Sequence, residues 1–213
     1  MVDLPDREVT IVPGGRYPIE LATDVTTKAG ATVHLRPIRP DDAPRLVVFH
    51  EHLSSRSVYR RFFSAHPRLS AAEVERFTHV DYVDRLALVV EDGDQLVAVG
   101  RYDRIPSTSE AEVAFVVADQ YQGQGIATLL LEQLADAAWR NGIATFMAET
   151  LAENRQMLGV FVNSGFRVST GFEDGVISVR FPIEPDDAYR TVRAARHERT
   201  PDLAHDRIPP TQR

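Results

Sequence analysis

The spacing of apolar and polar residues changes several times along the chain, and each change marks an expected element. Alternation at residues 33–38 predicts a strand. Helical spacing then predicts three helices, over residues 43–53, 55–63 and 70–78. Apolar runs return, with short turns between them, at residues 86–90, 95–105 and 111–117. Because these last three strands follow one another so closely, they are expected to form an antiparallel meander.

A different pattern follows the meander. Apolar residues share one face from Ile126 to Ala138, which predicts a long helix that Asn141-Gly142 ends. The elements expected next are a strand at 143–151, a helix at 153–163 and a hairpin of 166–172 with 176–183. A strand, a helix and another strand in succession predict a local parallel crossover. We therefore expect a mixed α/β protein with a mostly antiparallel sheet and flanking helices.

Composition bounds the predicted domain and excludes several classes of protein. Residues 1–30 are expected to be an irregular arm with room for one short strand, and residues 184–213 a polar tail or linker. Residues 31–183 then form one folded domain. The net charge of −7 argues against nucleic-acid binding, and the absence of cysteine excludes disulfides and thiolate nucleophiles. Without a signal peptide or a long apolar run, the sequence predicts a cytoplasmic protein that does not enter a membrane.

The segment Gln122-Gly123-Gln124-Gly125-Ile126-Ala127 joins the end of a predicted strand to the start of the long helix. Backbone amides at such a junction lack partners and point the same way, and the helix dipole adds positive potential. Glycine lets the backbone approach a ligand closely. These features predict a phosphate site, although the segment has no P-loop lysine. Taken alone, the hexapeptide fits equally well a helix start whose glycines serve only packing.

The order of the elements and this turn together resemble the GNAT superfamily of acetyl-CoA-dependent N-acetyltransferases. The GNAT turn has Gln or Arg, two variable residues, Gly, one variable residue, and then Gly or Ala, and residues 122–127 match at every position. The resemblance extends from about Val33 to Ile183 and implies the GNAT fold, whose sheet splays at a bulge. Residues 34–63, 111–117 and 148–166 are also similar to the bacterial Pat-like protein-lysine acetyltransferases, which implies a protein lysine as acceptor, for example on an acyl-CoA synthetase.

The resemblance implies which residues hold acetyl-CoA. The turn amides would hold the pyrophosphate, the free edge of the preceding strand would pair with the pantetheine arm, and Asn154 would contact the pantetheine region. Phe161 stands where many GNAT enzymes have a tyrosine, so it would form the cleft wall and leave the departing thiolate to be protonated by water. The implied cofactor-binding residues are Phe115, Val116, Val117, Gln122, Gly123, Gln124, Gly125, Ile126, Ala127, Asn154 and Phe161.

Acetyl transfer to an amine needs a base, because a lysine amine is almost fully protonated near pH 7. Glu112 is the candidate: it lies within an apolar strand and shares a face with Ala114 and Val116, since strand side chains alternate. Partial burial there would make its carboxylate a better base. The Ala-Glu-Val sequence also resembles the surroundings of the catalytic glutamate in lysine acetyltransferases. Glu110 is the reserve candidate, and a solvated or paired face is the structural alternative for Glu112.

Other polar groups are weaker candidates. The histidines lack the spacing of metal ligands, so no metal is expected, and no Gly-x-Ser-x-Gly elbow indicates a hydrolase. A solvated helix face is expected for Arg60-Arg61, with the coenzyme A 3′-phosphate or an acidic partner as alternatives. The loop residues Asp81, Tyr82 and Asp84 are expected either to line the acceptor mouth or to be ordinary loop.

The favoured function is direct attack of an amine on acetyl-CoA without a covalent enzyme intermediate, because no cysteine or other obvious nucleophile is present. A protein lysine is the favoured acceptor. A small amine is the first alternative, since acceptor sites are built from variable loops. A non-catalytic acyl-CoA sensor is the second: the missing tyrosine at position 161 favours it, and Glu112 opposes it.

Overall fold

The computed structural model describes residues 11–12 and 15–197, with side chains described to residue 196. Its strands are β1 (Ile11–Val12), β2 (Gly15–Arg16), β3 (Thr23–Thr26), β4 (Thr32–Pro37), β5 (Arg85–Asp92), β6 (Gln95–Arg104), β7 (Glu110–Val117), β8 (Thr145–Leu151), β9 (Ser169–Glu173) and β10 (Val176–Pro182). Its α-helices are α1 (Ala43–Glu51), α2 (Ser55–Phe62), α3 (Ala71–Thr78), α4 (Ile126–Arg140), α5 (Arg155–Val162) and α6 (Asp187–His197). Short 3₁₀ turns lie at Ile19–Leu21, Pro40–Asp42 and Asp119–Tyr121.

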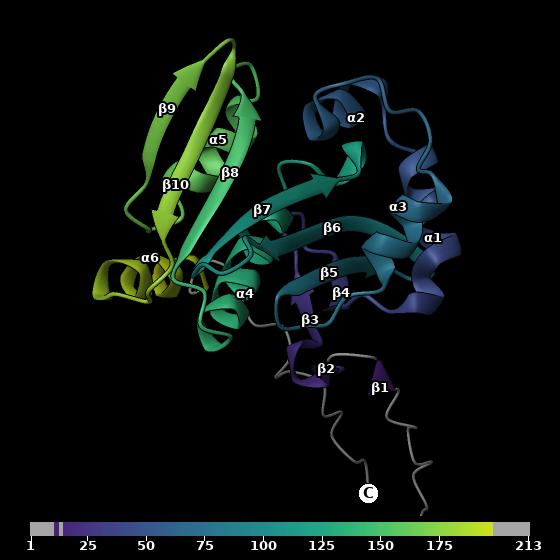
Figure 1. Cartoon of the computed structure of the whole chain (residues 1–213), viewed down its shortest axis with the longest axis horizontal. Coiled ribbons are helices and arrows are strands. Elements are labelled where there is room, and N and C mark those ends of the chain that lie inside the picture. Colours follow the sequence, from purple (N-terminus) through teal and green to yellow (C-terminus); the bar gives the residue numbers. More distant parts are fainter. Residues whose placement is uncertain (1–10, 13–14, 198–213) are drawn as a thin grey trace, which may run out of the picture.

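Eight strands form one open sheet in the order β3-β4-β5-β6-β7-β8-β10-β9 (Figure 1). Every pairing in it is antiparallel except that of β7 with β8, which α4 connects. The predicted meander and the predicted parallel crossover are therefore both confirmed.

The sheet divides where β7 meets β8. These two strands pair only from Glu110↔Thr145 to Glu112↔Met147 and then separate (Figure 1). The register of β7 with β6 stays regular from Ala111 to Val117, so the strands separate without the expected bulge in β7. Beyond Glu112, none of the described strands pairs with the β8-facing edge of β7, which leaves most of its backbone groups open to a ligand.

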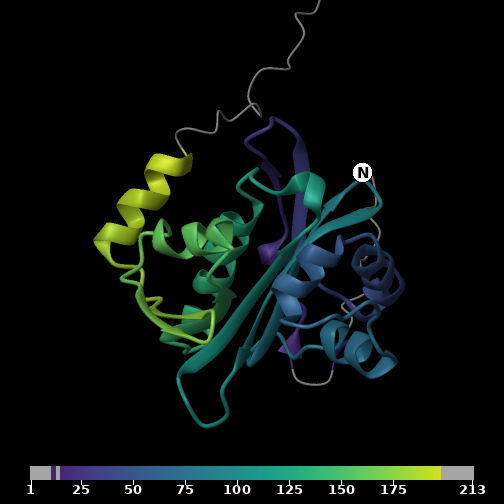
Figure 2. The same cartoon turned by 90° about the horizontal axis from the view of Figure 1, so that it is seen from above.

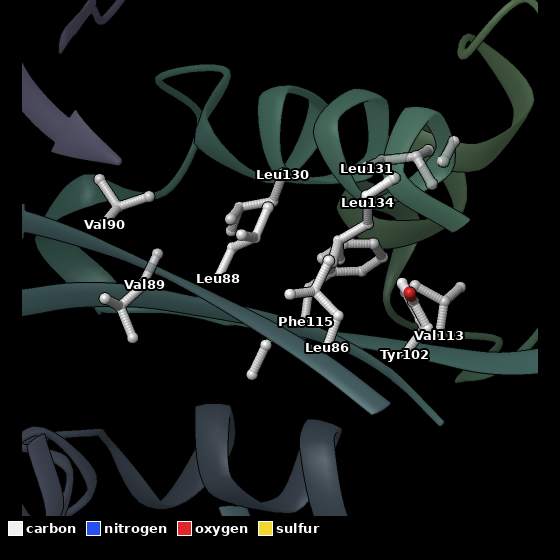
Figure 3. Close-up of a cluster of buried hydrophobic side chains, with 14 of the residues drawn as sticks. Leu86, Leu88, Val89, Val90, Tyr102, Val113, Phe115, Leu130, Leu131 and Leu134 are labelled. Carbon is white, nitrogen blue, oxygen red and sulfur yellow. The ribbon is translucent and has the colours of Figure 1, made fainter. Parts of the chain in front are cut away.

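Helices cover both faces of the sheet, with α1 to α3 on one face and α4 on the other (Figure 2). The odd-numbered residues of β7 point toward α4: Phe115 packs near Leu130 and Leu134 in the buried cluster of Figure 3. The even-numbered residues face the α2 side, where Ala114 and Val116 border a small cavity with Phe62. Alternation thus sends Glu112 to the α2 side, as expected.

Part of the predicted N-terminal arm belongs to the sheet. Strand β3 pairs with β4 from Thr23↔Leu35 to Thr26↔Thr32 and forms an edge of the sheet. The turn after β3 closes with hydrogen bonds from Thr27 N–H to Ala31 O at 2.8 Å and from Gly30 N–H to Thr27 O at 2.9 Å. The two-residue strands β1 and β2 form a separate ladder. These strands were not predicted individually, because they are too short to show a clear alternation of apolar and polar residues and lie among prolines and glycines.

The predicted polar tail contains the helix α6. Tyr189 is buried and stacks on Phe166 with the ring centroids 4.2 Å apart. The ion pairs Arg193–Asp136 and Arg196–Glu132 tie the same helix to α4. A single buried aromatic among charged residues gives little apolar periodicity, which explains why the sequence predicted a tail here. The last residues of that tail and the first residues of the arm lie outside the described part of the chain.

Among the described residues, no helix combines the length and the apolar character that a membrane crossing requires.

Candidate active site

A cleft of about 810 Å³ opens where β7 and β8 separate. Its walls come from α2, β7, the glycine turn, the start of α4, β8, α5 and one side of α6, and the β3–β4 turn adds Lys28. Of the predicted cofactor-binding residues, ten line it: Phe115, Val116, Val117, Gln122, Gly123, Gly125, Ile126, Ala127, Asn154 and Phe161. Glu112 lines the same cleft. The structure therefore brings together residues that lie up to 49 positions apart, from Glu112 to Phe161.

Both glycines of the turn adopt a backbone conformation that favours glycine. Gly123 and Gly125 have φ angles of +76° and +88°, in the left-handed region that L side chains rarely adopt. Gly125 is the residue before the first turn of α4, whose leading amides have no partner within the helix. The start of α4 thus presents unpaired amides of the kind that an anion site requires, and neither Gly123 nor Gly125 places a side chain over them.

Gln124 differs from its neighbours in the turn. Its side-chain amide donates to Gln120 O at 3.0 Å, and its backbone carbonyl accepts from Lys28 N–H at 3.1 Å. Gln124 is not among the residues that line the cleft. Its side chain closes the turn, and the carbonyl joins the turn to the β3–β4 hairpin.

Side chains that the sequence did not single out fix the turn against α2. Gln122 Nε2 donates to Ser57 Oγ at 3.0 Å and to Val117 O at 3.1 Å. The Asp119 carboxylate accepts from Ser54 N–H at 3.0 Å, Ser54 Oγ at 2.7 Å and Ser57 Oγ at 2.9 Å. Residues 54 and 57 lie more than 60 positions before these partners, so local sequence gave no signal of the contact.

Asp119→Ala is expected to lower the free energy of unfolding by about 1 kcal/mol, a small value because the carboxylate is exposed. Burial opposes ionisation of Asp119, but the donors on Ser54 and Ser57 outweigh it and hold the pKa below its usual value. The stabilisation is therefore present above the unfolded-state pKa and is lost as the pH falls through the lower folded-state value. Urea denaturation of both proteins from pH 7 to pH 3 checks this: a difference that stays constant over this range would contradict it.

Asn154 and Phe161 both contribute to the α5 side of the cleft. Asn154 precedes α5 and its Oδ1 accepts from Met157 N–H at 3.3 Å, so it caps the helix as well as lining the cleft. Phe161 is 1% exposed and its ring lies 6.1 Å from that of Phe115 and 5.8 Å from that of Phe181. This position agrees with the prediction that Phe161 forms part of the wall.

Glu112 lies at the last paired position of β7 and β8, where the cleft begins. Its side chain is exposed, which differs from the partial burial that its apolar strand suggested. Because β8 separates from β7 immediately beyond Glu112, the neighbouring strand does not shield this side chain from solvent. Arg61 lines the cleft beside Glu112. Burial and the positive charge of Arg101 lower the pKa of Arg61 to about 10, and the negative charge of Glu112 partly offsets this by raising it.

Glu110, the reserve candidate, is held in an ion pair outside the cleft. Both its carboxylate oxygens accept from Arg180 on β10, one of them from Nη1 at 2.8 Å. The hydrogen bonds and charge of Arg180 hold the pKa of Glu110 below its usual value. Glu110 is absent from the cleft lining, so the structure favours Glu112 over it.

Most of the weaker candidates have structural contacts. Asp81 Oδ1 accepts from the backbone amides of residues 83, 84 and 85, and the buried Tyr82 hydroxyl donates to Ile38 O at 2.9 Å. Asp84 pairs with Arg104 at 2.6 Å. No group of three His, Asp or Glu side chains within the described part of the chain is placed to hold a metal ion. In contrast, Arg60 and Arg61 line the cleft and do not lie on a fully solvated face.

The comparison with known proteins decides the family. A family model described as "Acetyltransferase (GNAT) domain" matches residues 32–167, which extend from β4 through α5 and include β7, the glycine turn and β8. This chain belongs to the GNAT acetyltransferases. A GNAT domain structure of the Streptomyces lividans protein PAT is 45% identical, covers 78% of this chain and 99% of that one, and superposes with a TM-score of 0.74.

Curated relatives agree with the GNAT assignment. The Mycolicibacterium smegmatis protein "Acetyltransferase Pat" is 32% identical over 166 residues, which are 76% of this chain and 49% of that protein. A Pseudomonas aeruginosa acetyltransferase is 33% identical over 141 residues, which are 64% of this chain and 76% of that one. This chain thus spans about half the length of the M. smegmatis relative.

Proposed function

We propose that this GNAT enzyme acetylates a lysine side chain on a protein, with Glu112 as the general base. The observation that carries the proposal is the position of Glu112: it occupies the last β7–β8 pair, at the point where the cleft opens. The protein acceptor rests on the resemblance to the Pat-like protein-lysine acetyltransferases, and the two relatives named Pat agree with that resemblance. The full activity of the longer M. smegmatis protein is a separate question.

The cleft offers binding groups for both the pyrophosphate and the pantetheine arm of acetyl-CoA. The amides at the start of α4, with Gly123 and Gly125 beside them, form a cradle for the pyrophosphate. From Val113 to Val117, the free edge of β7 offers backbone donors and acceptors to the amide groups of the pantetheine arm. Asn154 and Phe161 line the opposite side. Acetyl-CoA supplies the activated acyl group, and these residues bind and orient it.

Glu112 accepts the proton that the acceptor amine must lose. A lysine ammonium cannot attack a carbonyl, and proton removal leaves the nitrogen lone pair free for attack. The exposure of Glu112 allows an amine from outside, or a bridging water, to reach its carboxylate. Arg61 lines the cleft close enough to Glu112 for the two charges to interact.

No side-chain acid is assigned to the departing thiolate. Phe161 has no ionisable proton, and the Tyr121 hydroxyl, which also lines the cleft, donates to Asp92 Oδ2 at 2.7 Å. A thiolate is a weak base compared with the acceptor amine, so protonation from solvent is sufficient.

The test is incubation of the protein with acetyl-CoA and a purified acyl-CoA synthetase, with release of free thiol and mass spectrometry of the acetylated lysine as the two readouts. We expect acetylation of a lysine on the synthetase. Polyamines and amino sugars serve as parallel acceptors, and turnover only with these would favour the small-amine alternative. Binding of acetyl-CoA without turnover on any amine would favour a sensor and overturn the proposal.

A further inference from the structure

Lys28 is the only lysine among the 213 residues of this chain, which otherwise uses arginine for its basic side chains. It lies in the turn between β3 and β4, within the segment that the sequence predicted as an irregular arm. Its side chain lines the same cleft as Gly123, Gly125 and Ile126. The single lysine of an acidic protein is thus placed at the anion site of its cleft.

Two contacts fix Lys28 over the glycine turn. Its backbone amide donates to Gln124 O at 3.1 Å, which joins the hairpin to the turn. Its side-chain stem crosses Gly125: a Cβ built on that glycine would lie 3.4 Å from Cε, 3.6 Å from Cγ and 3.7 Å from Cδ of Lys28. The ammonium extends from Cε, so it lies within reach of an anion bound at the start of α4.

The ammonium has the chemistry that a bound phosphate requires. It carries a positive charge and three N–H donors, whereas the backbone amides of the turn carry only partial charge. The side chain is exposed, and it takes part in none of the ion pairs within residues 15–196. A carboxylate partner therefore does not neutralise it in the described part of the chain.

We propose that Lys28 is a phosphate ligand of coenzyme A, supplied to the glycine turn by the β3–β4 hairpin. The inference rests on the proposed placement of coenzyme A in this cleft. It adds a side-chain cation to a cradle that the turn sequence describes by backbone amides alone. It also gives the edge strand β3 a role in cofactor binding.

Three variants separate charge from packing. In Lys28→Met the apolar stem over Gly125 remains and the charge is lost, whereas Lys28→Arg keeps the charge. Arg140→Gln removes one positive charge at the far end of α4 and is the matched control. By calorimetry we expect the dissociation constant of coenzyme A to rise about tenfold in Lys28→Met. Lys28→Arg and Arg140→Gln are expected to bind within about twofold of the unaltered protein.

Removing single groups from the ligand locates the contact. If Lys28 binds the pyrophosphate, 3′-dephospho-coenzyme A shows the same loss in Lys28→Met; if it binds the 3′-phosphate, the loss disappears with this ligand. Equal affinity of Lys28→Met and the unaltered protein for coenzyme A would overturn the inference while leaving the proposed function intact. Failure of the unaltered protein to bind coenzyme A would instead contradict the cleft assignment itself.

Chemical labelling gives a readout independent of any substitution. An amine-reactive acetylating reagent can modify only one lysine side chain in this sequence, so the peptide that contains Lys28 reports its accessibility directly. We expect coenzyme A to protect Lys28 from labelling, and labelled protein to bind coenzyme A as weakly as Lys28→Met. Labelling at the same rate with and without saturating coenzyme A would contradict the contact.

Discussion

Gly125→Val is expected to abolish measurable binding of coenzyme A while the chain remains folded. Gly125 lies at the start of α4 with φ at +88°, and its missing side chain leaves the space over the leading amides open. A branched side chain there would occupy the space of the pyrophosphate and press on Lys28. Calorimetry with coenzyme A is the measurement, and circular dichroism verifies the fold.

Backbone strain must be separated from the loss of the cradle. A valine at this φ costs about 1–3 kcal/mol of stability wherever it occurs. Gly142 supplies the control, because it follows the other end of α4 with φ at +78°, and a Cβ added there would meet none of the described residues beyond its own chain neighbours within 4 Å. We expect Gly142→Val to lose similar stability and to bind coenzyme A normally. Unchanged affinity in Gly125→Val would rule out the phosphate cradle.

Glu112→Gln is expected to lower kcat/KM for the amine about 10²–10⁴-fold, which is the usual contribution of a general base. The amide keeps the size of the side chain and removes its ability to accept the proton. Affinity for coenzyme A is expected to change little, because the proposed cofactor contacts lie on the turn and the β7 edge. Thiol release across a range of pH measures the effect, and the residual rate should rise with pH as more of the amine becomes neutral.

Glu110→Gln is the matched control for this variant, since it makes the same chemical change two residues earlier on the same strand. Its carboxylate pairs with Arg180 outside the cleft, so the substitution is expected to leave acetyl transfer nearly unchanged. Full activity in Glu112→Gln together with a large loss in Glu110→Gln would transfer the role of base to Glu110.

Local patterns were sufficient for most elements. Helical spacing over residues 70–78 and the apolar run over residues 111–117 gave α3 and β7 close to their observed bounds. The glycine turn indicated a phosphate site because positive φ and free amides are properties of a few adjacent residues. The GNAT resemblance then connected this turn to Glu112, Asn154 and Phe161, all of which line the cleft.

Contacts between distant segments had no comparable signal. The exposure of Glu112 depends on where β8 leaves β7, which no spacing within either strand encodes. The helix α6 docks through one buried tyrosine, Tyr189, among charged residues whose pattern is typical of a tail. Only the fold brings Asp119 to Ser54 and Ser57.

The sequence by itself determined the elements from β4 to β10, their order and the residues of the turn, because these depend on periodicity, capping and backbone freedom over short distances. The tertiary structure decided which side chains share the cleft. The cleft opens because the pairing of β7 with β8 stops at Glu112. The docking of the β3–β4 hairpin places Lys28 over Gly125, which lies 97 positions away in the sequence. A phosphate cradle can be recognised from adjacent residues, whereas a cation supplied from a distant strand appears only when the sheet edge is in place.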